Sequence, residues 1–480
     1  MKKLKYILII LLGIHLVSCE NWLDINDNPN SATTVDPDYL FSGAVTSFSA
    51  TRTSGDGYFP IGFGSQLWSS GQLWGYAGDF YVFSTYTSGN NWRTYYETSG
   101  KNIDLAIQNA RKAEPVRSNA ISQLKIFQAL NFFQATLLFG DIPMSESFNN
   151  EILQPKFDPQ KQVFEQIIEL LDQAIDSIDV SSAVPAITTN DQLYSGDMSK
   201  WLALAKSLKF RTYFYLVDQE ASYATNINQM LAAGGMISSA SGELKFPYFD
   251  VAGNRFPMFS VGDQYYGPDG VDDMFMTPAD YDIMVPNEDP RLPKYFSFGE
   301  DDEGETVNYY QPIPASERAT TDCSYFNASV LAKPDQSDYL FTYSEQKYLE
   351  AEAYLRFGDN LADAETAFKD GLTAALERYE ISNDDINSFL AKFSFTDSQE
   401  ALTVLYEQTW IDMIDRPYMA FATWRRSGDE GSETPVLTKP INASTIGLLR
   451  RLNLPEAEVN SNSNAPSPAP KLDDKMWFDK

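Results

Sequence analysis

The stretch YSEQKYLEAEAYLRFGDNLADAETAFKDGLTAALERYE, from Tyr343 to Glu380, predicts two amphipathic helices folded back on each other. In its first half an apolar stripe recurs at helical spacing, formed by Tyr348, Leu349, Ala351, Tyr354 and Leu355, and Gly358 follows as a left-handed stop. In its second half small and large residues alternate at three- and four-residue steps: Ala364, Ala367, Phe368, Gly371, Leu372, Ala375 and Leu376. Small residues can therefore face large ones, and the two helix axes can approach closely.

One hairpin cannot bury its own apolar face, so the chain should contain stacked neighbours. The order Gly, Ala, Phe, Gly resembles the tetratricopeptide helix pair, with a turn after Gly358 that is one residue longer than usual. The same helical period recurs elsewhere, and we predict four helix pairs, at about 92–140, 160–218, 343–380 and 399–427.

The N-terminal segment MKKLKYILIILLGIHLVSCE has three lysines, an apolar run and then Leu16-Val17-Ser18-Cys19, which is the pattern of a lipoprotein signal peptide. The apolar run is shorter than the ~18 residues that a spanning helix needs. We therefore expect residues 1–18 to be removed, Cys19 to be lipidated, and 19–40 to form a tether from the outer membrane. The alternative is an ordinary signal peptide with an incidental cysteine.

Charge and composition exclude several function classes. Removal of 1–18 takes away Lys2, Lys3 and Lys5, so 33 basic residues remain against 66 acidic ones, a formal charge of −33, and no nucleic-acid partner is expected. The same cleavage removes His15, the only histidine, which excludes His-based triads and His-ligated metals. We expect no cofactor, no metal site and no catalytic residue. Only Cys323 remains besides Cys19, so no disulfide is expected.

Two segments differ from the helical pairs in composition. Residues 41–96 are rich in aromatic side chains and glycine, so several of their rings should lie on loops. Residues 226–338 form an insertion rich in Gly, Pro, Asp and aromatic residues, which we expect to fold as loops and short strands on the helical scaffold. The acidic run Glu300 to Glu305 is interpreted as a solvated loop tip, with a calcium site as the alternative.

Several short segments resemble, in order along the chain, the SusD/RagB family of outer-membrane lipoproteins. They are Cys19 with 22–26, Phe139-Gly140-Asp141-Ile142-Pro143, the run 194–201 leading into 207–211, Ala351-Glu352-Ala353-Tyr354 with Gly358-Asp359, 407–411 with 424–428, Arg450-Arg451-Leu452, and 476–479. One departure is Arg416-Pro417-Tyr418, at a place where the family often has a helix running into Glu-Ala-Trp.

The resemblance implies a mainly α, SusD-like fold in which four tetratricopeptide-like pairs carry a loop-rich, partly β central insertion within a single domain, 41–480. It also implies a surface protein that binds an oligosaccharide or a peptide and acts as a lid on a TonB-dependent, SusC-like outer-membrane transporter. The implied ligand site lies on loops of the aromatic stretch and of the insertion. Candidate ligand-binding residues there are Trp68, Trp74, Tyr76, Tyr81, Asp263, Tyr265 and Tyr266.

Two other function classes share parts of this pattern. A surface glycosidase would use two carboxylates, but acidic residues are so numerous that no pair is singled out by the sequence. A helical-repeat adaptor for another protein would share the fold without needing aromatic residues on glycine-rich loops. A binding screen with glycans and peptides would distinguish these classes.

Overall fold

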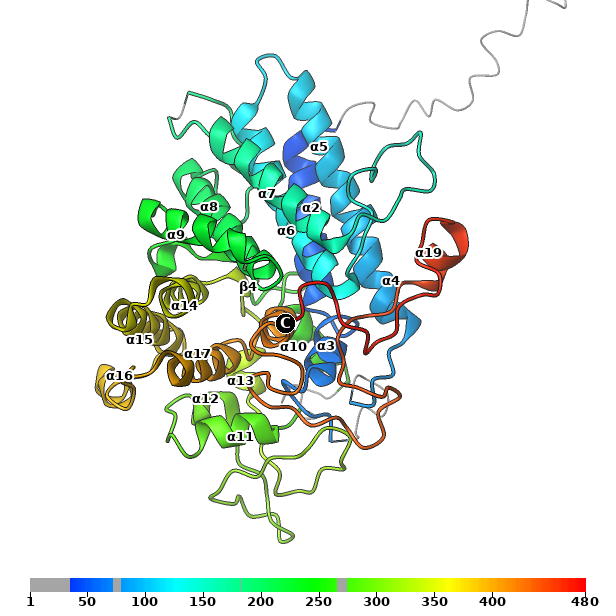
Figure 1. The fold of residues 1–480 in the computed structure, drawn as a ribbon. Coiled ribbons are helices and arrows are strands. Elements are labelled where there is room, and N and C mark those ends of the chain that lie inside the picture. Colours follow the sequence, from blue (N-terminus) through cyan, green and yellow to red (C-terminus); the bar gives the residue numbers. More distant parts are fainter. Residues whose placement is uncertain (1–34, 72–78, 182, 266–273) are drawn as a thin grey trace, which may run out of the picture. The chain divides into compact units, whose positions relative to one another are not determined.

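The computed structural model describes residues 35–71, 79–181, 183–265 and 274–480. The chain divides into a short N-terminal unit, Met1–Asp36, and a second unit, Pro37–Lys480, which contains all the elements given below. This second unit is mainly helical, as predicted (Figure 1).

Four helix pairs form the scaffold, which confirms the predicted fold class. They are α5 (Gly100–Lys112) with α6 (Ser118–Phe139), α7 (Gln160–Ser177) with α8 (Met198–Val217), α14 (Tyr343–Ala353) with α15 (Leu361–Glu377), and α17 (Ser398–Asp412) with α18 (Pro417–Trp424). The α16 helix (Asn383–Leu390) follows the third pair. Pro417 is the first residue of α18, a position at which proline's missing N–H costs nothing.

The hairpin of α14 and α15 packs as closely as its small residues predict. A Cβ atom added at Gly371 would lie 2.8 Å from a ring carbon of Tyr348, so only glycine allows this approach. The predicted left-handed stop at Gly358 is wrong by one residue, since Asp359 adopts the left-handed conformation with φ 46°. The reason is that the first helix ends in a wider π-helical turn, η4 (Tyr354–Gly358).

The aromatic stretch is more helical than the sequence predicts. It contains most of α2 (Pro37–Arg52), then α3 (Tyr58–Gly64) and α4 (Thr85–Arg93), and it ends in a π-helical turn η1 (Thr94–Thr98). Helix α2 begins inside the segment predicted as a tether and packs against α5. Its Phe41 and Phe48 meet Phe127 of α6 edge to face, with ring centroids 5.8 and 5.3 Å apart. The glycines of this stretch predict loops, but the burial of apolar rings outweighs their low helix propensity here.

The insertion contains the predicted loops and short strands, which form two small antiparallel sheets, and also several short helices that the sequence analysis does not predict. Its elements are α9 (Ala224–Ala233), β1 (Leu244–Phe246), α10 (Pro257–Tyr265), α11 (Pro278–Met284), α12 (Leu292–Tyr295), β2 (Phe296–Ser297), β3 (Tyr325–Phe326), α13 (Ala328–Leu331) and β4 (Asp338–Phe341), with 3-10 turns η2 (Ala221–Tyr223) and η3 (Ala240–Gly242) before β1. Strand β1 pairs with β4, and β2 pairs with β3. The last helix is α19 (Glu456–Ser461).

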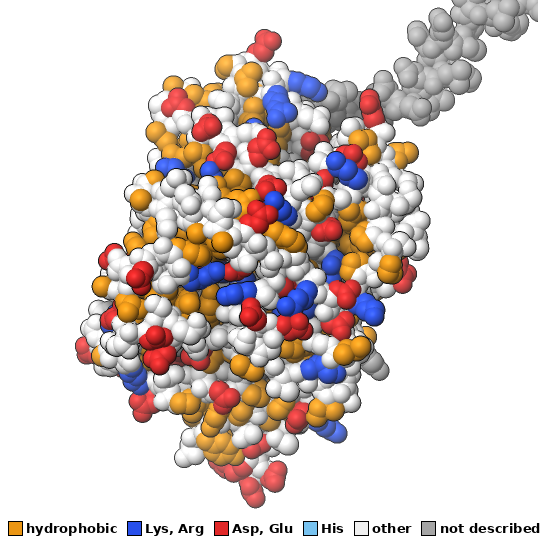
Figure 2. All heavy atoms as spheres, viewed as in Figure 1, with side chains coloured by type: hydrophobic (Ala, Val, Ile, Leu, Met, Phe, Trp, Pro, Cys, Tyr) orange, Lys and Arg blue, Asp and Glu red, His pale blue; other side chains and the backbone are white. Residues whose placement is uncertain are grey.

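Figure 2 shows acidic side chains spread over one face with Lys and Arg among them. In the acidic run, Asp301 accepts backbone hydrogen bonds from Glu303 and Glu305 at 3.1 and 2.8 Å within an exposed turn. This agrees with its interpretation as a solvated loop tip.

Candidate functional site

The two segments predicted to carry the ligand site are joined directly to each other. Ser69, which follows α3, and Phe275 of the insertion exchange two backbone hydrogen bonds of 3.0 and 2.8 Å. The N–H of Ala319 also donates to the carbonyl of Gly71 at 3.0 Å. The structure therefore brings the aromatic stretch and the insertion together, although they are about 200 residues apart in the sequence.

A buried carboxylate fixes this junction. Asp79 is 1% exposed, and its Oδ2 accepts hydrogen bonds from Ser70 N at 3.0 Å, from Ser70 Oγ at 2.6 Å and from Ser316 N at 3.4 Å. Burial raises the pKa of Asp79 to about 6, against the lowering effect of the hydrogen bonds from Ser70 and Ser316. One side chain thus holds two segments that approach from different parts of the chain.

A pocket of about 250 Å³ lies beside the junction. Its walls come from three regions of the chain: Gln66 after α3, insertion residues 277–279 with Pro314, Ala315 and Glu317, and the C-terminal loop 436–441. The pocket is slightly smaller than typical sites for drug-sized ligands, roughly 300–1,000 Å³. Its described lining is mainly aliphatic and proline, with a few polar groups and no aromatic ring.

Two of the candidate ligand-binding rings lie in the core next to this pocket. Trp68 is 0% exposed and stacks on Tyr58 with ring centroids 4.9 Å apart. Tyr81 is 1% exposed, and its hydroxyl accepts a 3.1 Å hydrogen bond from Nε2 of Gln66, a pocket residue. Burial raises the pKa of Tyr81 to about 12. Neither ring presents a face on which a ligand could stack.

The other candidates fall outside what the structure describes. Trp74, Tyr76 and Tyr266 lie between the described ranges. Asp263 and Tyr265 belong to helix α10, of which the backbone alone is described at these two positions. Their assignment to the ligand site stays a prediction.

The C-terminal wall of the pocket was missed by sequence reasoning. Loop 436–441 carries Val436 and Ile441, which are 75% and 78% exposed. It is followed by Ser444, whose N–H and hydroxyl donate to the carbonyls of Phe80 and Tyr81 at 2.9 and 2.7 Å. The one available signal was the apolar dipeptide Val436-Leu437 between Pro435 and Pro440, which is too short to indicate a partner segment.

A second buried carboxylate lies behind the pocket, at the start of α11. Asp280 is 0% exposed and accepts from Thr277 Oγ1 at 2.9 Å within a capping box. Burial raises its pKa to about 7, against the lowering effect of the hydrogen bonds from Thr277. Neither Asp79 nor Asp280 lines the pocket, so neither is placed to exchange a proton with a ligand there.

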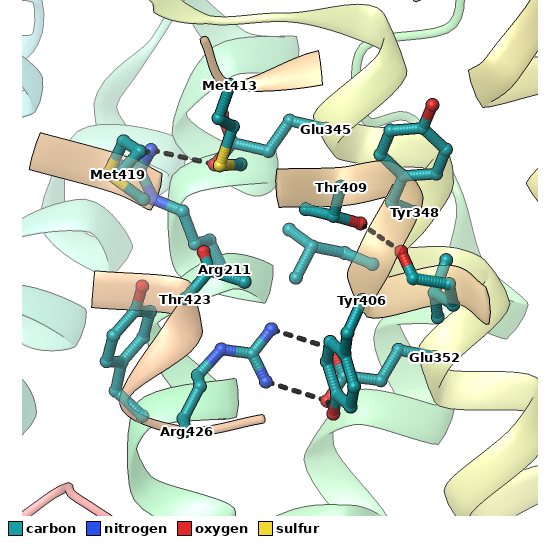
Figure 3. Close-up of a pocket in the computed structure, with 13 residues that line it drawn as sticks. Arg211, Glu345, Tyr348, Glu352, Tyr406, Thr409, Met413, Met419, Thr423 and Arg426 are labelled. Atoms are coloured by element: carbon teal, nitrogen blue, oxygen red, sulfur yellow. Dashed lines mark hydrogen bonds and ion pairs between the residues drawn. The ribbon is translucent and has the colours of Figure 1, made fainter. Parts of the chain in front are cut away.

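Another pair of carboxylates lies inside the scaffold. Glu345 and Glu352 border a cavity of about 20 Å³ between α8, α14, α17 and α18, room for about one water molecule (Figure 3). Both oxygens of Glu352 accept from Arg426, at 2.7 and 2.6 Å. Burial raises the pKa of Glu352, but the charges of Arg426 and Arg356 outweigh it and lower the pKa to about 2. These carboxylates stabilise the packing of the helix pairs.

No group of three or more His, Cys, Asp or Glu side chains in the described ranges could hold a metal ion. Among the described helices, none is long and apolar enough to cross a membrane.

A family model described as "Starch-binding associating with outer membrane" matches residues 29–453. The chain therefore belongs to the SusD-like family, as its sequence resemblance indicated. Proteins of this family associate with the outer membrane and with carbohydrate, and they are generally binding proteins rather than enzymes. No curated protein sequence matches the chain.

Solved structures show the same fold. An AC2a SusD-like protein of Bacteroidetes is 19% identical, with 93% of this chain and 100% of that one covered and a TM-score of 0.78. A chitin-binding protein is 21% identical, with coverage of 93% and 100% and a TM-score of 0.76. A SusD homologue from Bacteroides uniformis is 17% identical, with coverage of 92% and 99% and a TM-score of 0.75.

Proposed function

We propose that this chain is a cell-surface lipoprotein, anchored through acyl chains on Cys19, that captures an oligosaccharide and passes it to a TonB-dependent, SusC-like outer-membrane transporter. The observation that supports the location of the site is the backbone pairing of Ser69 with Phe275, which joins the aromatic stretch to the insertion beside the pocket. Membership in a starch-binding family supports the ligand class.

A peptide ligand is the second candidate, because of the chemistry of the pocket. Sugar rings stack on aromatic faces, whereas the described lining offers Pro278, Pro314, Val436 and Ile441. Aliphatic and proline side chains suit the apolar side chain of a peptide residue. The polar groups of Gln66 and Glu317 could bind its backbone.

A glycosidase is the third candidate, and the described carboxylates give it little support. Asp79 and Asp280 have raised pKa values but are buried behind the pocket, and Glu352 is paired with arginine. Release of reducing sugar from any glycan by the purified chain would establish this alternative instead.

The test is calorimetric titration of the full chain, solubilised in detergent, with maltoheptaose, chitohexaose and tryptic peptides of casein. Replacement of the partly buried Ala279 by Phe should fill the pocket and weaken binding of the true ligand by tenfold or more. The matched control is Ala362→Phe, on an exposed position of α15. Equal affinity in both variants would contradict the proposed site, and binding of the casein peptides alone would select the peptide alternative.

A further inference from the structure

We propose that the helical scaffold carries a second binding site, a groove for a neutral oligosaccharide between α5, α6, α7 and the loop 144–148. The groove has a volume of about 250 Å³ and lies on helices that Figure 1 draws in the upper half, whereas α11 and α12 of the insertion lie near the bottom. Its lining shares no residue with the pocket beside the Ser69–Phe275 junction.

Two aromatic rings form the floor of this groove. Phe132 of α6 is buried, and Phe148 of the loop is partly exposed, with ring centroids 5.9 Å apart and planes tilted by 38°. Met144 and Leu170 complete the apolar part of the lining. A partly exposed ring at the base of a concave surface is the platform on which the apolar face of a sugar stacks.

Phe148 is held there in an unusual conformation. Its φ is +63°, in the left-handed region that a bulky side chain rarely adopts. The Nζ atom of Lys101 donates to the Phe148 carbonyl at 2.9 Å and lies 5.7 Å from the ring centroid. The ring also packs against Gly100, where a Cβ atom would lie only 2.6 Å from it. Several contacts thus hold one strained residue so that its ring stays in the groove.

The rim of the groove offers polar groups without partners. The side chains of Gln128 and Gln166 line it and form no hydrogen bond with any other described residue. Asp104 lines it too, and its carboxylate is oriented by Gln108 Nε2 at 2.9 Å and Lys101 Nζ at 3.3 Å. A primary amide both donates and accepts, and a carboxylate accepts, which together match the hydroxyl groups of a sugar.

Charge favours a neutral ligand. Asp104 and Glu169 line the groove, and among the described lining residues none is Lys or Arg. An anionic sugar would gain no cationic partner from these lining residues and would meet the carboxylate of Glu169, while Asp104 is already paired with Lys101 at 3.3 Å. A peptide could not bind there by adding a strand, because α5, α6 and α7 offer no strand edge.

The groove is tested in the Ala279→Phe background, in which the loop pocket is filled, so that remaining binding reports on the groove. The probes are maltoheptaose and chitohexaose, with trigalacturonate as the anionic comparison. Full chains are compared by calorimetry and by hydrogen exchange of the amides in α6 and α7. The double variant Gln128→Leu with Gln166→Leu replaces the two unpaired amides by apolar side chains of similar volume. The control is Gln162→Leu, at an exposed position of α7 that does not line the groove.

We expect a neutral probe to slow exchange in α6 and α7 and to bind the double variant at least tenfold more weakly than the control. If neither neutral probe slows amide exchange in α6 and α7, the groove is only a hydrated surface and the inference is wrong. The same holds if the double variant and the control bind the neutral probes with equal affinity. Tighter binding of trigalacturonate would overturn the ligand class. The result that would contradict the groove differs from the result that would contradict the loop pocket. If the loop pocket is not a binding site, Ala279→Phe leaves total ligand binding undiminished.

Discussion

Replacing Trp68 by Ala tests whether this ring serves the core or the ligand. The indole is 0% exposed, stacks on Tyr58, and meets Phe63 and Phe326 edge to face at 6.2 and 5.6 Å. Removing a buried Trp typically costs about 3–5 kcal/mol through lost burial and the cavity left behind. We therefore expect the free energy of unfolding to fall by about that amount, a large part of the ~5–15 kcal/mol that a typical domain has.

The assay is urea denaturation beside titration with whichever probe binds the wild type. The folded fraction of Trp68→Ala should keep its affinity within a few-fold, since no part of the indole reaches the pocket. Trp68→Phe serves as the control and should lose less stability, because it keeps a ring against Tyr58. The reasoning would be refuted by a Trp68→Ala protein that unfolds like the wild type and binds tenfold more weakly, the behaviour of an exposed stacking ring.

Three further outcomes are expected. Cys19→Ala should abolish labelling by radioactive palmitate and release the protein from the membrane fraction, and equal retention would contradict lipid anchoring. Burial raises the pKa of Asp280 from 3.8 to about 7, so its contribution to stability is present below pH 4 and is lost as pH rises through 7. Asp280→Asn should remove up to about 4 kcal/mol of this pH dependence of the free energy of unfolding, measured by urea denaturation from pH 4 to 8. Glu352→Gln should cost about 3–5 kcal/mol because it leaves Arg426, 2% exposed, without its countercharge, and a melting curve like that of the wild type would show that the pair is dispensable.

Long periodic segments were predictable because each helix carries its own signal. The apolar stripes of α7 and α15 can be recognised without knowledge of their partners, whereas α6 is buried on nearly every side and is recognised by its length and apolar content. The close approach at Gly371 follows from its position opposite Tyr348. The left-handed residue is Asp359 rather than the predicted Gly358, because the helix ends in a π-helical turn. Such a turn contains one residue more than an α-helical turn, and the apolar periodicity does not reveal it.

The site was harder to predict because it depends on contacts between distant segments. The hydrogen bonds of Ser69 to Phe275 and of Ser444 to Phe80 use backbone groups, which leave no mark in the sequence. Aromatic composition pointed to a recognition surface, but Trp68 and Tyr81 are core residues. A cluster of rings in a glycine-rich segment meets the needs of packing and of binding equally well, so composition alone cannot separate the two.

The way the insertion is closed suggests how ligand preference can change on a constant scaffold. Strand β4, at the C-terminal end of the insertion, pairs with β1, and Asp338 of β4 forms a 2.9 Å ion pair with Arg52 of α2. Strand β4 leads directly to Thr342, which caps α14. The insertion is therefore fastened at its base to α2 and to the third helix pair, and Arg291 within it also donates to Gln408 of α17. Substitutions at loop positions of the pocket wall, such as Pro314 and Glu317, can alter the pocket without removing these contacts. The pocket's aliphatic lining is then a property of the loops, and the ligand class has to be determined from them rather than from the fold.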